Sequence, residues 1–332
     1  MKRLLICIFA ALMCATEGLA KNENSKTALV NNMYYLLDAA DSSAMAVGAP
    51  DEKKKKNITY PEHVVFPDTI IHKHKKYVLR SIYNDVFAFN QDVKRVTIPN
   101  TLTSSDYQTY NLCLGLEEPV YNDTLFAYMP RNYVQNNSDY VIPHGIRRIE
   151  DWAFSGLMSL RSLVMPNTVT EIGIAAFSDC YALSSVKLSD YIKCISNLAF
   201  ASCHNLRTIV IPNSVKSVNS LAFSECQLEK IVLGTGLEII YADAFNSNYK
   251  KKHYLLREAE LDENGQKQYT IREITIYREI PPKVEGKFNL SPHQEKIVLY
   301  VPFFCVEAYK NHPEWGKFDV RPIPPVNDTL AG

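Results

Sequence analysis

The chain has 332 residues, of which 46% are hydrophobic and 22% are charged, so a packed core is expected and wholesale disorder is not. Its 36 basic and 36 acidic residues give a formal net charge of zero, which argues against binding nucleic acid or a membrane surface through bulk charge. Beyond the N-terminus, no stretch approaches the roughly 18 apolar residues that span a bilayer. Any electrostatic function must therefore come from local patches of charge.

The first part of the chain has the pattern of a signal peptide. Two basic residues precede an almost continuous apolar run from Leu4 to Ala15, and Gly18-Leu19-Ala20 supplies small residues where a signal peptidase reads. We expect residues 1–20 to be removed, so that an exported chain begins at Lys21. The alternative is a lipoprotein anchored to the membrane through Cys14.

A repeat of 23 residues is the strongest signal in the sequence. Four segments align without gaps on a phenylalanine, and five further positions, from eight residues before it to eleven after it, are apolar in all four. At 46% apolar residues, unrelated sequence would do this with odds of roughly 10⁻⁸. Two further segments follow, the first of them with one residue deleted. The repeats are centred on Phe87, Phe154, Phe177, Phe200, Phe223 and Phe245.

Each repeat predicts a short strand followed by a return. The pattern Leu-x-x-Val-x-Leu ends in alternation, which places two apolar side chains on one face of a strand. Pro99, Pro166 and Pro212 end three of these strands. One repeat cannot bury its own apolar face, but stacked repeats can pair their strands in a parallel sheet. We therefore predict a β-rich solenoid of the α/β leucine-rich-repeat type, with about seven or eight coils.

The residues of these repeats resemble a known family. The segment IPHGIRRIEDWAFSGLMSLRSLVMPNTVTEIGIAAFSDCYALSSVKL is similar to the BspA-like leucine-rich repeat of surface proteins from anaerobic bacteria. YNDTLFAYMP followed by YVIPHGI resembles an inserted hairpin of that family. VNNMYYLLDAADSSAMAV and LYVPFFCVEAYKNHPEWGKF resemble its N-terminal hairpin cap and its C-terminal cap. The resemblance implies an adhesion protein that binds host matrix proteins, other cells or glycans and has no catalytic activity.

The predicted organisation follows from the repeats and these terminal segments. The stretch between Asn246 and Tyr269 contains Asp262-Glu263-Asn264-Gly265, a turn signal that predicts a protruding hairpin. Caps are needed because an open solenoid end exposes an unpaired strand. We expect a signal peptide at 1–20, an N-terminal cap at 21–76, a solenoid at 77–298 with insertions at about 100–141 and 246–269, and a C-terminal cap at 299–332.

Three cysteines, Cys180, Cys203 and Cys226, recur with the repeat and should form a column. A metal site or a disulfide ladder is one interpretation. However, the chain has no C-x-x-C pair, and side chains that leave stacked strands in parallel give poor disulfide geometry. We favour buried free thiols and expect neither a metal nor a cofactor.

No catalytic motif is present in the sequence. We find no glycine-rich phosphate loop, no H-E-x-x-H and no G-x-S-x-G. We therefore predict a binding protein rather than an enzyme. The alternatives are a structural component of the cell envelope and a glycan-processing enzyme with a pair of acids that sequence cannot identify. We expect an extracellular protein or glycan partner, no nucleic acid, and a membrane only if the chain is lipid-anchored.

The outward strand positions form the first candidate ligand site. They carry seven cations against only Glu229 and Glu273, beside a stripe of β-branched residues. Such a basic face would suit an acidic glycan or an acidic protein, whereas the alternative is that its charge only keeps the sheet soluble. The cations are Lys94, Arg95, Arg161, Lys187, Arg207, Lys230 and Arg272.

The first predicted insertion forms the second candidate site. Its tyrosines would suit protein and sugar recognition if they are exposed, because a rigid amphipathic ring offers contact area at low entropic cost. Alternatively, they pack over the coil edge that the insertion leaves open. They are Tyr107, Tyr110, Tyr121, Tyr128, Tyr133 and Tyr140.

Three Asp-Thr-apolar triplets resemble O-glycosylation sites of bacteria that carry this family. The acceptor residues would be Thr69, Thr124 and Thr329.

Overall fold

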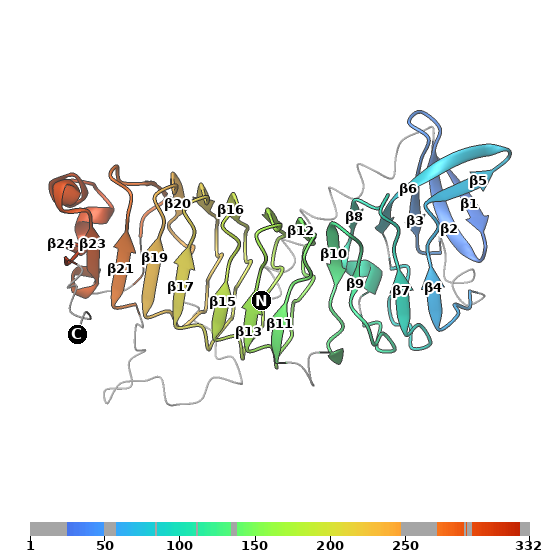
Figure 1. The fold of residues 1–332 in the computed structure, drawn as a ribbon, viewed down its shortest axis with the longest axis horizontal. Coiled ribbons are helices and arrows are strands. Elements are labelled where there is room, and N and C mark those ends of the chain that lie inside the picture. The colour runs from blue at the N-terminus through green and yellow to red at the C-terminus, as the bar shows by residue number, and fades with distance from the viewer. Residues whose placement is uncertain are drawn as a thin grey trace, which may run out of the picture. The chain divides into compact units, whose positions relative to one another are not determined.

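The computed structural model describes residues 25–49, 58–83, 85–110, 112–133, 138–246, 271–288, 290 and 294–325. The predicted signal peptide, Thr329 and nearly all of the predicted hairpin at 246–269 lie outside these residues. The chain forms two compact units, residues 1–122 and residues 123–332. We call them the first unit and the second unit and describe each by itself (Figure 1).

The first unit begins with an antiparallel meander of β1 (Ser25–Val30), β2 (Met33–Asp38) and β3 (Ser43–Val47). Buried and partly exposed residues alternate along β2, as expected for a strand with one face on a core. Asn31 and Asn32 both have positive φ, 48° and 64°. Asparagine tolerates this left-handed conformation, which a two-residue hairpin turn requires.

This meander continues into the longest strand of the first unit. β3 pairs in parallel with β6 (Lys75–Tyr83), which forms an antiparallel hairpin with β5 (Thr69–His72). On its other side, β6 pairs in parallel with β8 (Ser104–Ser105). The segment predicted as the N-terminal cap is therefore hydrogen-bonded to the first coils through one shared strand.

The first unit also contains a coil that the repeat alignment missed. β4 (His63–Val65) pairs in parallel with β7 (Arg95–Thr97), and η1 (Tyr107–Tyr110) and β9 (Val120–Tyr121) follow. The ring of Tyr110 stacks on Phe87 with centroids 6.1 Å apart, so Tyr110 takes the place of the core phenylalanine. Part of the expected insertion is therefore a regular coil layer.

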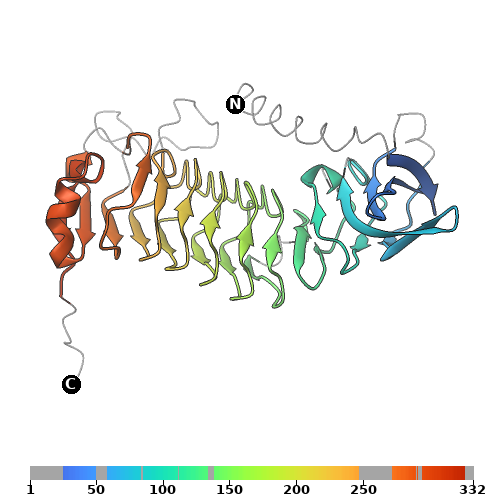
Figure 2. The same ribbon diagram turned by 90° about the horizontal axis from the view of Figure 1, so that it is seen from above.

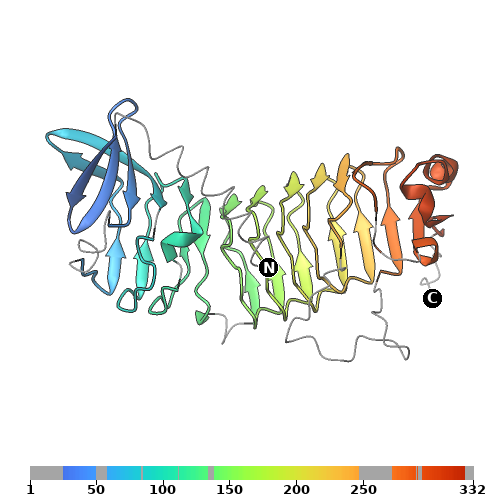
Figure 3. The same cartoon turned by 180° about the vertical axis from the view of Figure 1, so that it is seen from behind.

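The second unit contains two facing walls of parallel strands, shown from opposite sides in Figures 1 and 3. In the first wall, partner residues on the first three strands are 23 positions apart, as in Leu163 and Val186, and those on the fourth and fifth strands are 22 apart after the deletion, as in Ile209 and Ile231. The last three strands pair at offsets of 43, 25 and 21 residues. The hydrogen-bonded ladder of this wall is interrupted between the third and fourth strands. The strands are β11 (Asp139–Val141), β13 (Ser162–Val164), β15 (Ser185–Lys187), β17 (Thr208–Ile211), β19 (Lys230–Leu233), β21 (Glu273–Ile276), β23 (Val298–Val301) and β24 (Asp319–Pro322).

The opposite wall consists of shorter strands, most of which again pair one coil apart, for example Ile149 with Ile172. Figure 2 shows the stacked coils of this unit from above. The first of the shorter strands pairs in parallel with the second, although it lies in the stretch that the repeat alignment treated as an insertion. The strands are β10 (Leu125–Tyr128), β12 (Arg148–Ile149), β14 (Glu171–Ile172), β16 (Cys194–Ile195), β18 (Ser217–Val218), β20 (Ile239–Tyr241) and β22 (Lys283–Glu285).

A column of stacked phenylalanines fills the space between the two walls. Consecutive ring centroids are 4.6 to 5.4 Å apart, close to the roughly 4.8 Å between paired strands. All of these rings are buried. This arrangement confirms the prediction of a β-rich solenoid with a parallel sheet. The column contains Phe126, Phe154, Phe177, Phe200, Phe223 and Phe245.

Each regular coil bends through two residues in the left-handed conformation. One stands two positions before the core phenylalanine and the other two positions after it. Only one of these eight positions carries glycine, so most coils accept the strain of a side chain at positive φ. They are Trp152, Ala175, Leu198 and Leu221 before the ring, and Gly156, Asp179, Ser202 and Glu225 after it.

The C-terminal segment packs on the last coil. It contains η4 (Gln294–Lys296), η5 (Phe303–Cys305), α3 (Val306–Lys310) and η6 (Trp315–Lys317). The buried Trp315 donates a hydrogen bond from Nε1 to the carbonyl oxygen of Pro282 at 2.8 Å. An aromatic side chain with a satisfied polar atom therefore anchors this segment.

Replacing Phe200 with alanine should reduce the free energy of unfolding by about 3–5 kcal/mol, because the ring stacks on both neighbours and its removal leaves a cavity. Urea unfolding of the predicted mature chain, followed by circular dichroism, measures this loss. Phe303→Ala is the matched control, since Phe303 is 80% exposed, and it should change the free energy by less than about 0.5 kcal/mol. Equal losses in the two variants would contradict the column's role.

Candidate functional site

We call the outward face of the first wall in the second unit the sheet face. On it, the register of the paired strands aligns equivalent residues in rows. One row along it consists of Val141, Val164, Lys187, Val210 and Val232, and we call it the valine row. Val141 is 64% exposed and Val210 is 55% exposed. Regular strands whose inward residues fill the core therefore hold aliphatic side chains out toward solvent.

A second row on the sheet face is polar. It lies two residues before the valine row on each strand and contains hydroxyl and charged side chains. Ser162 donates a hydrogen bond to Asp139 on the neighbouring strand at 2.7 Å. The row consists of Asp139, Ser162, Ser185, Thr208, Lys230 and Glu273.

Five of the seven predicted cations lie at this face, but in three different rows. Arg161, Arg207 and Arg272 come immediately before the strands β13, β17 and β21. Lys187 stands in the valine row and Lys230 in the polar row. The structure therefore distributes these charges across the face rather than along one line.

Two of these five cations are in ion pairs. Lys230 Nζ lies 2.7 Å from Glu273 Oε1, and Arg207 lies 3.8 Å from Glu229. Exposed pairs of this kind contribute about 0–1 kcal/mol to stability, but they reduce the charge that a ligand meets. Among the residues that the structure describes, three of the predicted cations are in no ion pair: Arg161, Lys187 and Arg272.

The other two predicted cations belong to the first unit and are also paired. Lys94 lies 3.2 Å from Glu62, and Arg95 lies 2.5 Å from Glu118. The sequence did not indicate these acids, because Glu62 precedes the first aligned repeat and Glu118 lies in the stretch taken as an insertion. The first unit therefore adds little unpaired positive charge.

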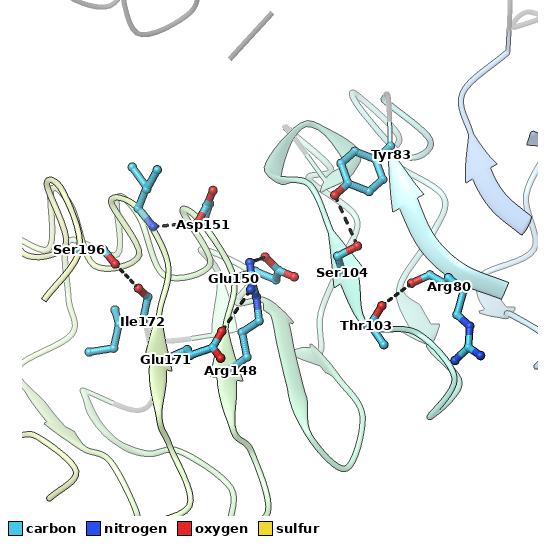
Figure 4. A network of polar contacts seen from close by, with 11 residues as sticks. Arg80, Tyr83, Thr103, Ser104, Arg148, Glu150, Asp151, Glu171, Ile172 and Ser196 are labelled. Carbon is cyan, nitrogen blue, oxygen red and sulfur yellow. Dashed lines mark hydrogen bonds and ion pairs between the residues drawn. The ribbon is translucent and has the colours of Figure 1, made fainter. Parts of the chain in front are cut away.

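The opposite wall of the second unit contains a network centred on Arg148 (Figure 4). Its guanidinium lies 3.4 Å from Glu150 and 3.2 Å from Glu171. Burial of the guanidinium favours its neutral form, but the attraction of Glu150 and Glu171 outweighs this and raises the pKa of Arg148. Glu150 is only 3% exposed, so the arginine compensates a buried carboxylate. The arrangement stabilises the wall and offers no open pair of acids to a substrate.

Hydrogen bonds between coils complete this wall (Figure 4). Asp151 accepts one from the backbone N–H of Ile174 at 2.7 Å, and burial raises the pKa of this carboxyl group. Ser196 donates from Oγ to the carbonyl oxygen of Ile172 at 2.5 Å. A Cβ atom on Gly173 would lie 2.4 Å from the Asp151 nitrogen, so only glycine fits between these coils.

The first unit contains comparable contacts between coils. Thr103 donates from Oγ1 to the carbonyl oxygen of Arg80 at 3.3 Å, and Tyr83 donates from its hydroxyl to Ser104 Oγ at 3.4 Å (Figure 4). These polar contacts, like those of the opposite wall in the second unit, join residues about one coil apart and are structural.

Most of the predicted tyrosine site is not an exposed surface. Tyr110 is fully buried, so this residue is not available to a ligand. Tyr133 and Tyr140 pack against the core of the second unit, with Tyr140 5.7 Å from Phe154. These rings pack over the coils, which was the alternative interpretation of the sequence.

The remaining tyrosines do not restore such a surface. Tyr121 is 44% exposed and belongs to the first unit, whereas Tyr128 is half-buried in β10 of the second unit. The side chain of Tyr107 is not among the parts of the chain that the structure describes. A ligand site built from these tyrosines has no support in their packing.

Two of the predicted glycosylation residues are described. Thr69 is half-buried at the start of β5. Thr124 is exposed, and its carbonyl oxygen accepts a hydrogen bond from the N–H of Arg147 at 2.7 Å. Glycosylation of Thr69, Thr124 and Thr329 remains a prediction.

The three repeated cysteines form the expected buried column. The thiols of Cys180, Cys203 and Cys226 donate to backbone carbonyl oxygens of the neighbouring coil at 3.2, 3.3 and 3.1 Å. Burial raises the pKa of Cys180 to about 12. The pKa of Cys203 is also raised, mainly by burial and to a smaller extent by a hydrogen bond with Cys226. The thiolate, which is the reactive form, is therefore disfavoured.

In the part of the chain that the structure describes, no group of three or more histidine, cysteine, aspartate or glutamate side chains is placed to hold a metal ion. No helix in the same part of the chain has the length and apolar character needed to cross a membrane.

Comparison with known proteins identifies the repeat. The family model of the BspA type leucine rich repeat region matches in six copies, over residues 56–139 and 132–252. These residues make up more than half of the chain, and they include the stacked coils described above. The chain belongs to the BspA-type leucine-rich-repeat family.

Solved structures with similar folds include three bacterial proteins. A leucine rich cell surface protein from Faecalibacterium prausnitzii is 16% identical with a TM-score of 0.39, covering 67% of this chain and 92% of that chain. The pneumococcal vaccine antigen PcpA is 13% identical with a TM-score of 0.49, and the match covers 90% of this chain and 99% of that chain. A leucine rich repeat protein from T. pallidum is 22% identical with a TM-score of 0.41, covering 58% and 85%. No curated protein matches the chain, so the family assignment rests on the repeat model and the coils.

The three column cysteines should resist alkylation in the native protein. With a pKa of about 12, only about one Cys180 thiol in ten thousand is ionised at about pH 8, and the coils also block access. Iodoacetamide labelling mapped by mass spectrometry should find Cys180, Cys203 and Cys226 unmodified until urea is added. The partly exposed Cys194 is the internal control and should be labelled first. Native labelling of all four at one rate would refute the buried column.

Proposed function

We propose that this protein is exported and acts outside the cell as a non-catalytic binding protein, with the sheet face of the second unit as its ligand platform. The observation that carries this proposal is the valine row, an outward-facing aliphatic line on a regular sheet in which Val141 and Val210 are exposed and Val164 and Val232 are half-buried. Exposed apolar patches are often functional surfaces, and solenoids bind ligands on extended repeated faces. The signal-peptide pattern at residues 1–20 supports export.

The family resemblance implies three kinds of ligand: host matrix proteins, other cells and glycans. The charges of the sheet face favour a ligand with some acidic character, because Arg161, Lys187 and Arg272 are in no ion pair within the described residues. Three exposed cations give a modest dependence on salt, since exposed charges are screened beyond about 8 Å at physiological ionic strength. Apolar contacts with the valine row then supply most of the affinity.

A catalytic role has less support. Glu150 and Glu171 both contact Arg148, but Glu150 is buried. A glycosidase needs two carboxyl groups open to the sugar, which this pair does not provide. A purely structural role in the envelope does not require aliphatic side chains held out to solvent.

Two carboxylates in place of valines in the valine row should weaken binding. In the double variant Val164→Asp/Val210→Asp, two carboxylates would have to be desolvated against an apolar partner, so affinity should fall at least tenfold. The probes are an immobilised panel of host matrix proteins and a glycan array, each screened with the predicted mature chain. Both changes replace outward side chains, and circular dichroism verifies the fold.

The matched control is Met158→Asp, because Met158 is 60% exposed in the same unit but lies outside the strands of the sheet face. It should bind like the unmodified protein. If the double variant also retains full binding, the sheet face is not the ligand platform. If the unmodified protein binds nothing on either panel, the proposed function itself is contradicted.

A further inference from the structure

Lys187 is the single charged residue of the valine row. It stands on β15, with Val164 on the strand before it and Val210 on the strand after it. Its side chain is exposed and is in no ion pair among the residues that the structure describes. The hydrogen-bonded ladder of the sheet is interrupted beside the same strand. The centre of this aliphatic row is therefore a solvent-facing cation.

No acid on the surrounding strands compensates this charge. The polar-row residues on the same and adjacent strands are Ser162, Ser185 and Thr208, which can donate hydrogen bonds but carry no charge. Asp139 is one strand further away and accepts a hydrogen bond from Ser162. A carboxylate above Lys187 would thus meet an ammonium group and the hydroxyl donors of Ser185 and Thr208, a combination that favours acids.

The neighbours of Lys187 favour a protein partner over a sugar. Sugar recognition makes use of exposed aromatic rings, and the valine row contains none. Tyr300, which continues this line of outward positions beyond Thr275, lies on β23, four strands away from β15. Valine side chains instead match the aliphatic side chains of a protein segment.

The spacing of the row indicates the conformation of that segment. The core rings of these three coils stack with centroids 4.9 and 5.1 Å apart, so Val164 and Val210 project about 10 Å apart on either side of Lys187. On an α-helix, residues i−4 and i+4 lie about 11–12 Å apart along one face. In an extended segment, residues i−2 and i+2 lie about 13–14 Å apart. A helix laid across the strands therefore fits the row better than an extended peptide does.

We infer that the sheet face receives an amphipathic helix of a partner protein, with an acidic residue on Lys187 and aliphatic residues one turn before and after it on Val164 and Val210. This inference rests on the proposed function and specifies the ligand for the same face. It accounts for a lone cation in an aliphatic row, because an acid at the centre fixes the register of an otherwise uniform apolar contact.

A selection experiment with exchanged charge tests the inference. A displayed library of helical peptides, randomised at one position and at the positions four residues to each side, is selected on the predicted mature chain. The unmodified protein should enrich glutamate or aspartate in the centre and leucine, isoleucine or valine on both sides. Exchange of the central acid for its amide should weaken binding about tenfold. Lys187→Glu should enrich lysine or arginine at the centre instead.

Lys193→Glu is the control, because Lys193 is exposed and immediately precedes β16 on the opposite wall, and it should select the same peptides as the unmodified protein. Failure to select any helix, or selection of the same central residue by the Lys187→Glu variant, would overturn the inference. Lys187-dependent binding to an acidic glycan in place of a peptide would also overturn it. Peptides that ignore Lys187 but are lost in Val164→Asp/Val210→Asp leave the proposed function standing, whereas peptides indifferent to both changes contradict both proposals.

Discussion

The distance between stacked coils is the constraint on which the rest of the second unit depends. Parallel strands pair at about 4.8 Å, and the core rings stack at 4.6 to 5.4 Å, so backbone hydrogen bonding and aromatic packing are satisfied by the same translation. The buried thiols follow it as well, each donating to a carbonyl of the preceding coil. A residue that suits one coil therefore suits the equivalent place in the next, and the sequence repeats.

The same translation creates the surface. Because outward positions from β11 to β19 recur after 22 or 23 residues, side chains distant in sequence become neighbours in straight rows. One row can then be aliphatic while the adjacent row is polar. The position of a single deviating residue, such as Lys187, defines a place along a row that would otherwise be uniform. Recognition in such a molecule depends on exceptions to the repeat more than on the repeat itself.

The fold could be predicted from the sequence because its main determinant is local and periodic. The missed coil shows where this fails. Tyr110 replaces the core phenylalanine, and Ser105 stands where most other coils have isoleucine, so the apolar pattern falls below recognition although the backbone still stacks. The coil keeps its packing and its backbone hydrogen bonds with these two residues, but a search for a repeated hydrophobic pattern does not find it.

The candidate site was less predictable, because its properties depend on contacts between coils. Counting charges on the strands gave seven cations, but Glu62 and Glu118 pair with two of them from outside the aligned repeats. The burial of Tyr110 likewise depends on the ring of Phe87, 23 residues earlier. Neither these ion pairs nor the burial of Tyr110 can be predicted from the local sequence around these residues.

The left-handed residues of each coil have a consequence for how such arrays change over time. Alanine, leucine, tryptophan, aspartate, serine and glutamate all occupy these places, although each costs about 1 kcal/mol or more relative to glycine in that conformation. A coil copied by gene duplication carries this cost with it, and only tight stacking on both neighbours offsets it. Lengthening the array by one coil adds one net interface between coils, so that single interface must offset the cost of two further left-handed residues.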